Sequence, residues 1–199
     1  MLCLTHSTDP RWATSAVASL PDLLADHAHC EMKAASNALS LATRWPASTR
    51  LARALAALAE EELRHFRAVV DELERRGIPL GKPEVDEYVA ELRKAANVSG
   101  KQTPEASLID RLLVASLIEA RSCERFRLLA DGLAERGDPL ATFYDDLFVC
   151  EARHYTTLVD LAIEASGGDE EAVRARLAVL ARQESVIAAR LGVRPSIHG

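Results

Sequence analysis

The chain has 199 residues, which is enough for one domain to bury a sizeable core without disulfides. Aromatic residues make up only 5% of it, and runs of β-branched residues are scarce, so the composition favours an all-α protein over a β-sheet protein. The formal net charge of −6 argues against a strongly basic nucleic-acid-binding protein, but it does not exclude a nucleic acid as partner.

Apolar residues at helical spacing predict six helices, separated by turns that contain glycine or proline. In chain order, the expected ranges are about 21–43, 48–76, 84–97, 104–136, 140–165 and 170–191. Residues 1–20 are expected to form an irregular lead-in, and Thr103 is expected to cap the fourth helix with Pro104 in its first turn. The first two helices and the fourth and fifth then form two hairpins, joined by a long connection that holds the short third helix.

The four cysteines, Cys3, Cys30, Cys123 and Cys150, include no Cys-x-x-Cys pair. This excludes a zinc ribbon and a rubredoxin-type iron site. No charged segment with an apolar stretch follows Met1, and no apolar run reaches the length of a membrane span. We therefore expect a soluble, cytoplasmic protein with no membrane as partner.

One pattern occurs twice: a lone glutamate in the first helix of a hairpin is followed by Glu-x-x-His in the second helix. The first copy comprises Glu31, Glu62 and His65, and the second comprises Glu119, Glu151 and His154. Residues three apart share a helix face, so each Glu-x-x-His directs a carboxylate and an imidazole to the same point. The matched spacing of the two copies indicates a duplicated hairpin with a two-metal site.

A second glutamate, Glu124, competes with Glu119 for the role of ligand. Glu119 lies on an apolar stripe, where a carboxylate needs neutralisation, whereas Glu124 has Arg121 and Arg127 three residues to either side. We therefore expect Glu119 to be the ligand and Glu124 to be the partner of an arginine.

Four carboxylates and two imidazoles are ligands that suit iron or manganese. Two divalent ions would neutralise the four carboxylates, and zinc is disfavoured because no cysteine belongs to the set. Metal pairs of this kind support oxygen chemistry. The ligands alone do not distinguish a hydroxylase, a desaturase, a radical generator, a peroxidase and an iron-storage ferroxidase.

Two antiparallel hairpins with a long crossover and this ligand set are typical of ferritin-like bundles. The sequence therefore predicts an all-α, ferritin-like four-helix bundle with accessory helices. We expect one domain over residues 1–199, with a core bundle at about 22–165 and an accessory helix at about 170–191 whose role is open.

The residues around the ligands carry a more specific resemblance. Segments 24–36, 61–66, 118–126 and 150–155 closely resemble the tRNA 2-methylthio-N6-isopentenyladenosine hydroxylase family. The resemblance implies a non-haem di-iron monooxygenase that hydroxylates the isopentenyl side chain of (2-methylthio-)N6-isopentenyladenosine next to the anticodon in tRNA. It also implies that the six residues of the repeated pattern ligate two iron ions, with O2 as co-substrate.

The resemblance further implies tRNA and an external electron donor of the reductase or ferredoxin type as partners, with a monomer or small oligomer as the assembly. The alternative is a ferritin-like or rubrerythrin-like protein that oxidises iron or scavenges peroxide. Clustered arginines are typical of a solvated face, although a tRNA substrate would favour phosphate contacts. They are Arg64, Arg67, Arg75, Arg76, Arg121, Arg125 and Arg127.

Overall fold

The computed structural model describes residues 2–97 and 100–198, and within them every regular element is an α-helix. The helices are α1 (Arg11–Ala18), α2 (Leu20–Arg44), α3 (Thr49–Arg76), α4 (Glu87–Ala95), α5 (Pro104–Ala134), α6 (Leu140–Ala165) and α7 (Glu170–Leu191). The all-α prediction is confirmed, and the six predicted helices begin and end within about one turn of the observed α2 to α7. No helix in the described ranges is long and apolar enough to cross a membrane.

The helix ends follow local sequence signals. The Ser48 side chain accepts a hydrogen bond from the Leu51 backbone N–H at 3.1 Å and caps α3, which ends at Gly77 with a left-handed φ of 68°. Thr103 caps α5 as predicted, because its side chain accepts from the Ala106 backbone N–H at 3.2 Å.

Helix α1 corrects one prediction, because residues 11–18 were expected to be irregular. Trp12 and Ala16 lie one turn apart and are fully buried, and α1 packs on α5. The Arg125 guanidinium carbon lies 5.0 Å from the centroid of the Trp12 ring, a cation–π distance. Eight residues are too few for a clear periodic signal in the sequence. Packing against α5, rather than local helix propensity, therefore stabilises α1.

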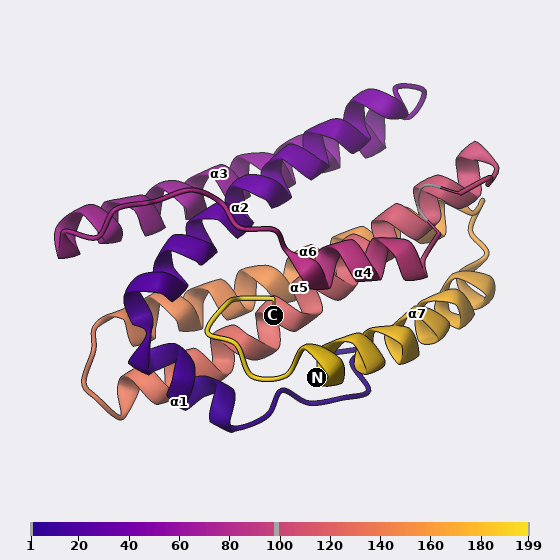
Figure 1. Ribbon diagram of the computed structural model, residues 1–199. Coiled ribbons are helices and arrows are strands. Elements are labelled where there is room, and N and C mark those ends of the chain that lie inside the picture. Colours follow the sequence, from indigo (N-terminus) through magenta and orange to yellow (C-terminus); the bar gives the residue numbers. More distant parts are fainter. Residues whose placement is uncertain (1, 98–99, 199) are drawn as a thin grey trace. The chain divides into compact units, whose positions relative to one another are not determined.

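The contacts group the chain into two compact units, which are described separately. The α2–α3 unit comprises residues 19–85 and 195–197, and its two helices pack side by side as a hairpin (Figure 1). The α5–α6 unit comprises residues 1–18, 86–194 and 198–199. In it, α5 and α6 form the second hairpin, and α1, α4 and α7 also contact α5 (Figure 1). A single domain over 1–199 stays a prediction.

Arg121 and Arg125 correct a second prediction, because they were counted with the solvated or RNA-docking arginines and are instead buried. Burial and, second to it, the nearby charge of Arg121 lower the pKa of Arg125 to about 10. The lead-in and Glu184 of α7 contact Arg121, and Trp12 of α1 packs against Arg125. Neither guanidinium is therefore open to phosphate.

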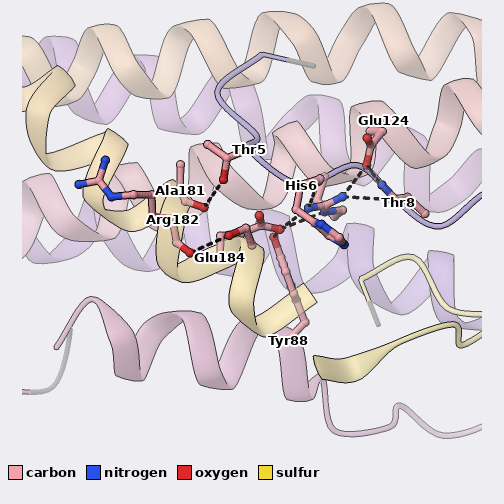
Figure 2. Close-up of polar contacts among 10 residues, drawn as sticks. Thr5, His6, Thr8, Tyr88, Glu124, Ala181, Arg182 and Glu184 are labelled. Carbon is pink, nitrogen blue, oxygen red and sulfur yellow. Dashed lines mark hydrogen bonds and ion pairs between the residues drawn. The ribbon is translucent and has the colours of Figure 1, made fainter. Parts of the chain in front are cut away.

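Arg121 lies at the centre of a buried polar network in the α5–α6 unit. Figure 2 labels Thr8, Glu124 and Glu184, whose side chains belong to this network. The Nε and Nη2 atoms of Arg121 donate to Glu184 Oε1 on α7 at 3.0 and 2.7 Å. Nη1 donates to Thr8 Oγ1 at 3.0 Å and to Glu124, and Nη2 also donates to the His6 carbonyl at 3.1 Å. All five N–H groups of the guanidinium are thus used, and the expected pairing of Glu124 with an arginine is confirmed.

Candidate metal centre

The first Glu–Glu–His cluster lies within the α2–α3 unit. One ligand atom each of Glu31, Glu62 and His65 lies within 4.8 Å of the others. His65 Nδ1 is 3.5 Å from Glu31 Oε2 and 3.7 Å from Glu62 Oε2. Glu62 and His65 share one face of α3, and Glu31 faces them from α2. The hairpin therefore brings the three side chains together, as the sequence spacing predicts.

His27 holds the first of these carboxylates from one turn earlier on α2. Its Nε2 lies 2.6 Å from Glu31 Oε1, and its side chain is fully buried. Burial alone would raise the pKa of Glu31, but hydrogen bonds with Glu62, His27 and His65 outweigh it and hold that pKa well below its usual range. Glu31 is therefore an ionised carboxylate with a fixed orientation.

The second Glu–Glu–His cluster lies within the α5–α6 unit. One ligand atom each of Glu119, Glu151 and His154 lies within 4.8 Å of the others, and His154 Nδ1 is 3.2 Å from Glu151 Oε2. Glu119 comes from α5 and the other two from one face of α6. The cluster therefore repeats the arrangement of the first one.

Two neighbours on α5 and α6 shape the surroundings of the second cluster. Burial and, second to it, the charge of Glu151 raise the pKa of the Cys123 thiol to about 12. In the metal-free protein this thiol is protonated at neutral pH. Tyr144 is fully buried with its ring centroid 5.4 Å from that of Phe126, so it packs as a core residue.

The donor chemistry of both clusters fits a metal ion. Each cluster offers two carboxylates and one imidazole, and each of the six side chains belongs to a residue that is at most 9% exposed. Buried carboxylates need compensating positive charge, and one divalent ion per cluster balances two of them. Oxygen and imidazole donors without thiolate suit iron or manganese. That the six residues act together on two ions stays a prediction.

The Arg121 network is what reasoning from sequence missed near this centre. Glu184 and Thr8 lie 63 and 113 residues from Arg121 along the chain, and no local spacing relates them. The one available signal was the arginine three residues before Glu124, which indicated that pair only.

The fold and the two clusters of carboxylates and imidazoles are those of one class of protein, the ferritin-like carboxylate proteins. A solved structure agrees: the chain is similar to protein 43 with aldehyde deformylating oxygenase activity from Synechococcus, with a TM-score of 0.88 and 35% identity. That similarity covers 100% of this chain and 96% of the other. The ferritin-like fold class is confirmed.

Two curated relatives and a family model are more specific. The relatives are both named tRNA 2-(methylsulfanyl)-N(6)-isopentenyladenosine(37) hydroxylase. The one from Pseudomonas putida is 39% identical over 155 residues, covering 78% of this chain and 72% of the relative. The one from Salmonella typhimurium is 32% identical over 198 residues, covering 76% and 71%. The model of the family tRNA-(MS[2]IO[6]A)-hydroxylase (MiaE) matches residues 1–199, and the chain belongs to this family of tRNA-modifying oxidoreductases.

Proposed function

We propose that this protein is a di-iron monooxygenase that hydroxylates the isopentenyl side chain of N6-isopentenyladenosine, with or without the 2-methylthio group, next to the anticodon in tRNA. The match of residues 1–199 to the hydroxylase family is the observation that carries the proposal. The Glu–Glu–His cluster in each unit supports it, because the chemistry needs a metal pair.

Six side chains would hold two iron ions in this proposal: Glu31, Glu62, His65, Glu119, Glu151 and His154. When bound, the iron pair supplies the redox chemistry that activates O2 for insertion of one oxygen atom into a C–H bond. The protein holds its own donors in place for this, as His27 does for Glu31 at 2.6 Å.

The overall stoichiometry fixes what else the reaction needs. Hydroxylation converts R–H, O2, two electrons and two protons into R–OH and water. The electrons would come from an external donor of the reductase or ferredoxin type, and the protons from water. We further propose that the protein acts in the cytoplasm as a monomer or small oligomer, which light scattering of the purified protein checks.

The decisive experiment supplies the purified protein with iron, O2, a reductant and tRNA that carries the prenylated adenosine. Nucleoside mass spectrometry should then find one added oxygen on the modified adenosine. Glu62→Ala should abolish the product, whereas Glu60→Ala, an exposed glutamate on the same helix, should leave it unchanged. Iron-loaded protein that consumes O2 without forming this nucleoside would overturn the proposal.

The solved structure from Synechococcus favours a second candidate, the oxidative removal of a formyl group from an aldehyde. The whole chain resembles a protein titled with that activity at 35% identity, and the same metal pair could serve it. Incubation with a fatty aldehyde, reductant and O2, followed by detection of the hydrocarbon and formate, tests this candidate. We rank it second because both curated relatives are named tRNA hydroxylases.

A further inference from the structure

A second buried polar constellation lies in the α5–α6 unit, apart from the Arg121 network. Ser122 Oγ is 3.0 Å from His198 Nε2, and His198 Nδ1 is 3.0 Å from Asp86 Oδ2. The three residues come from α5, from the segment after α7 and from the residue that caps α4. Together they form a continuous hydrogen-bonded line of a serine, a histidine and an aspartate.

The order of these groups is that of a hydrolase triad, but the backbone rules out that use. A nucleophilic serine needs nearby free N–H groups that stabilise an oxyanion. Ser122 lies in the interior of α5 (Pro104–Ala134), where backbone N–H groups bond to carbonyls four residues earlier. The line is therefore not a hydrolase triad.

The two ends of the line differ in exposure and in neighbours. The Asp86 side chain is 13% exposed at the N-terminus of α4, and Ser122 is 5% exposed. Ser122 lies three residues after Glu119, so the two share a face of α5. The line thus runs from the partly exposed end of α4 to the turn next to a predicted iron ligand.

The histidine in the middle is held in one orientation. Its ring stacks on that of Tyr88 with centroids 5.9 Å apart and planes at 22°. The Asp86 Oδ1 atom accepts from the Val89 backbone N–H at 2.9 Å, which leaves Oδ2 directed at the imidazole. Because both the ring and the carboxylate are fixed, a proton can move between them without rearrangement of heavy atoms.

We propose that Asp86, His198 and Ser122 form a proton relay that supplies the hydroxylation with protons from solvent. The inference rests on the proposed function, which consumes two protons in each turnover. An imidazole suits this role because it can accept a proton at one ring nitrogen while it releases one from the other.

One inward transfer moves two hydrogens and balances. His198, with a hydrogen on each ring nitrogen, passes the one on Nε2 to Ser122 Oγ, while the serine hydroxyl hydrogen passes to the oxygen derived from O2 that the proposed reaction protonates. The ring is left neutral, with its remaining hydrogen on Nδ1 facing the Asp86 carboxylate, which stabilises the charged ring before the transfer. Solvent then returns a proton to the ring between turnovers.

The first arm of the test measures turnover in iron-loaded full-length protein. Asp86→Asn keeps an oxygen that can cap α4 but turns the amide NH2 toward the imidazole, so the ring loses its carboxylate partner, and Ser122→Ala removes the inner hydroxyl. Each should lower the hydroxylation rate by at least about tenfold and raise the share of O2 that is consumed without product. Ser122→Thr, which restores a hydroxyl, should recover the rate.

Ser116→Ala is the matched control. Ser116 is also buried on α5, three residues before Glu119, but its hydroxyl donates to the Leu113 carbonyl at 2.9 Å within the helix. The Ser116→Ala variant should leave unchanged both the hydroxylation rate and the share of O2 that is consumed without product. Iron content and circular dichroism should match the wild type in all variants. If Asp86→Asn and Ser122→Ala also match it in rate and coupling, the segment after α7 is only a structural contact and the relay is overturned.

The second arm uses metal-free protein, so it does not depend on turnover. Nitrogen-15 chemical shifts of His198 should place a proton on Nδ1 and show Nε2 as an acceptor. Ser122→Ala should shift the Nε2 signal and Asp86→Asn the Nδ1 signal. If neither substitution shifts the His198 nitrogen signals, the relay is overturned even where the wild type is active. A wild type that forms no hydroxylated nucleoside while these signals respond overturns the proposed function instead.

Discussion

At the scale of single residues, the candidate centre depends on contacts one helical turn apart. His27 and Glu31 are four residues apart on α2, a spacing that places two side chains next to each other on any helix. This spacing places His27 one turn before Glu31, and the structure holds its Nε2 atom 2.6 Å from Glu31 Oε1. Such local pairs are predictable because helix geometry alone sets them.

His27→Gln should weaken iron binding roughly ten- to a hundredfold, because Glu31 then loses the group that fixes its orientation. Iron affinity is measured by competition with a chelator of known strength. His29→Gln on the same helix, whose side chain is half-buried, is the control and should bind iron as the wild type does. Equal affinity in the two variants would contradict a positioning role for His27.

The Cys123 thiol provides a prediction about pH. Its pKa is raised from 9.0 to about 12, first by burial and then by Glu151, so the folded protein retains a proton there that the unfolded chain loses. This contribution to stability is fully present below pH 9 and is lost as pH rises from 9 to 12. Alkylation with iodoacetamide at pH 9 should therefore leave Cys123 unlabelled in the folded protein and label it fully in urea. Peptide mass spectrometry gives the outcome, and rapid labelling of folded protein would refute it.

At the scale of elements, periodicity predicted α2, α3, α5, α6 and α7 because each presents an apolar stripe over many turns, and it also predicted the short α4 of nine residues. It missed α1, whose eight residues fold against α5. It also misplaced Arg121 and Arg125, because a charged residue on a helix is normally solvated and only distant partners reverse this. Those partners, Thr8 and Glu184 among them, could not be found without the fold.

Arg121→Met should destabilise the protein by about 3–5 kcal/mol, because it leaves the buried Glu184 carboxylate without its cation. The double variant Arg121→Met with Glu184→Met should recover most of this loss. Arg127→Met, which removes an exposed pair with Asp145 at 2.7 Å, should cost at most about 1 kcal/mol. Urea unfolding followed by circular dichroism measures all three, and equal losses for Arg121 and Arg127 would contradict the assignment.

At the scale of the whole molecule, each hairpin carries one complete Glu–Glu–His cluster, which the duplicated sequence pattern predicted in full. The sequence could do this because ligand spacing within a hairpin depends on helix periodicity alone. Joint action of the clusters on a metal pair depends on contacts between distant segments, which no spacing encodes.

Iron stoichiometry tests that joint action directly. The wild type should bind two iron ions per chain, counted by iron analysis after removal of free metal. If the clusters share their ligands, Glu62→Ala and Glu151→Ala should each lose both ions, because a bridged pair does not survive loss of a shared carboxylate. Retention of one tightly bound ion in each variant would show two independent sites.

Arg121 has a consequence for how such sequences can change over time. One guanidinium serves a carboxylate on its own helix, a carboxylate on α7, and a hydroxyl and a carbonyl of the lead-in. A substitution at any one of these side chains leaves the others with a buried, unbalanced charge or donor. Positions 8, 121, 124 and 184 should therefore covary: a relative should either keep all four residues or have all four replaced.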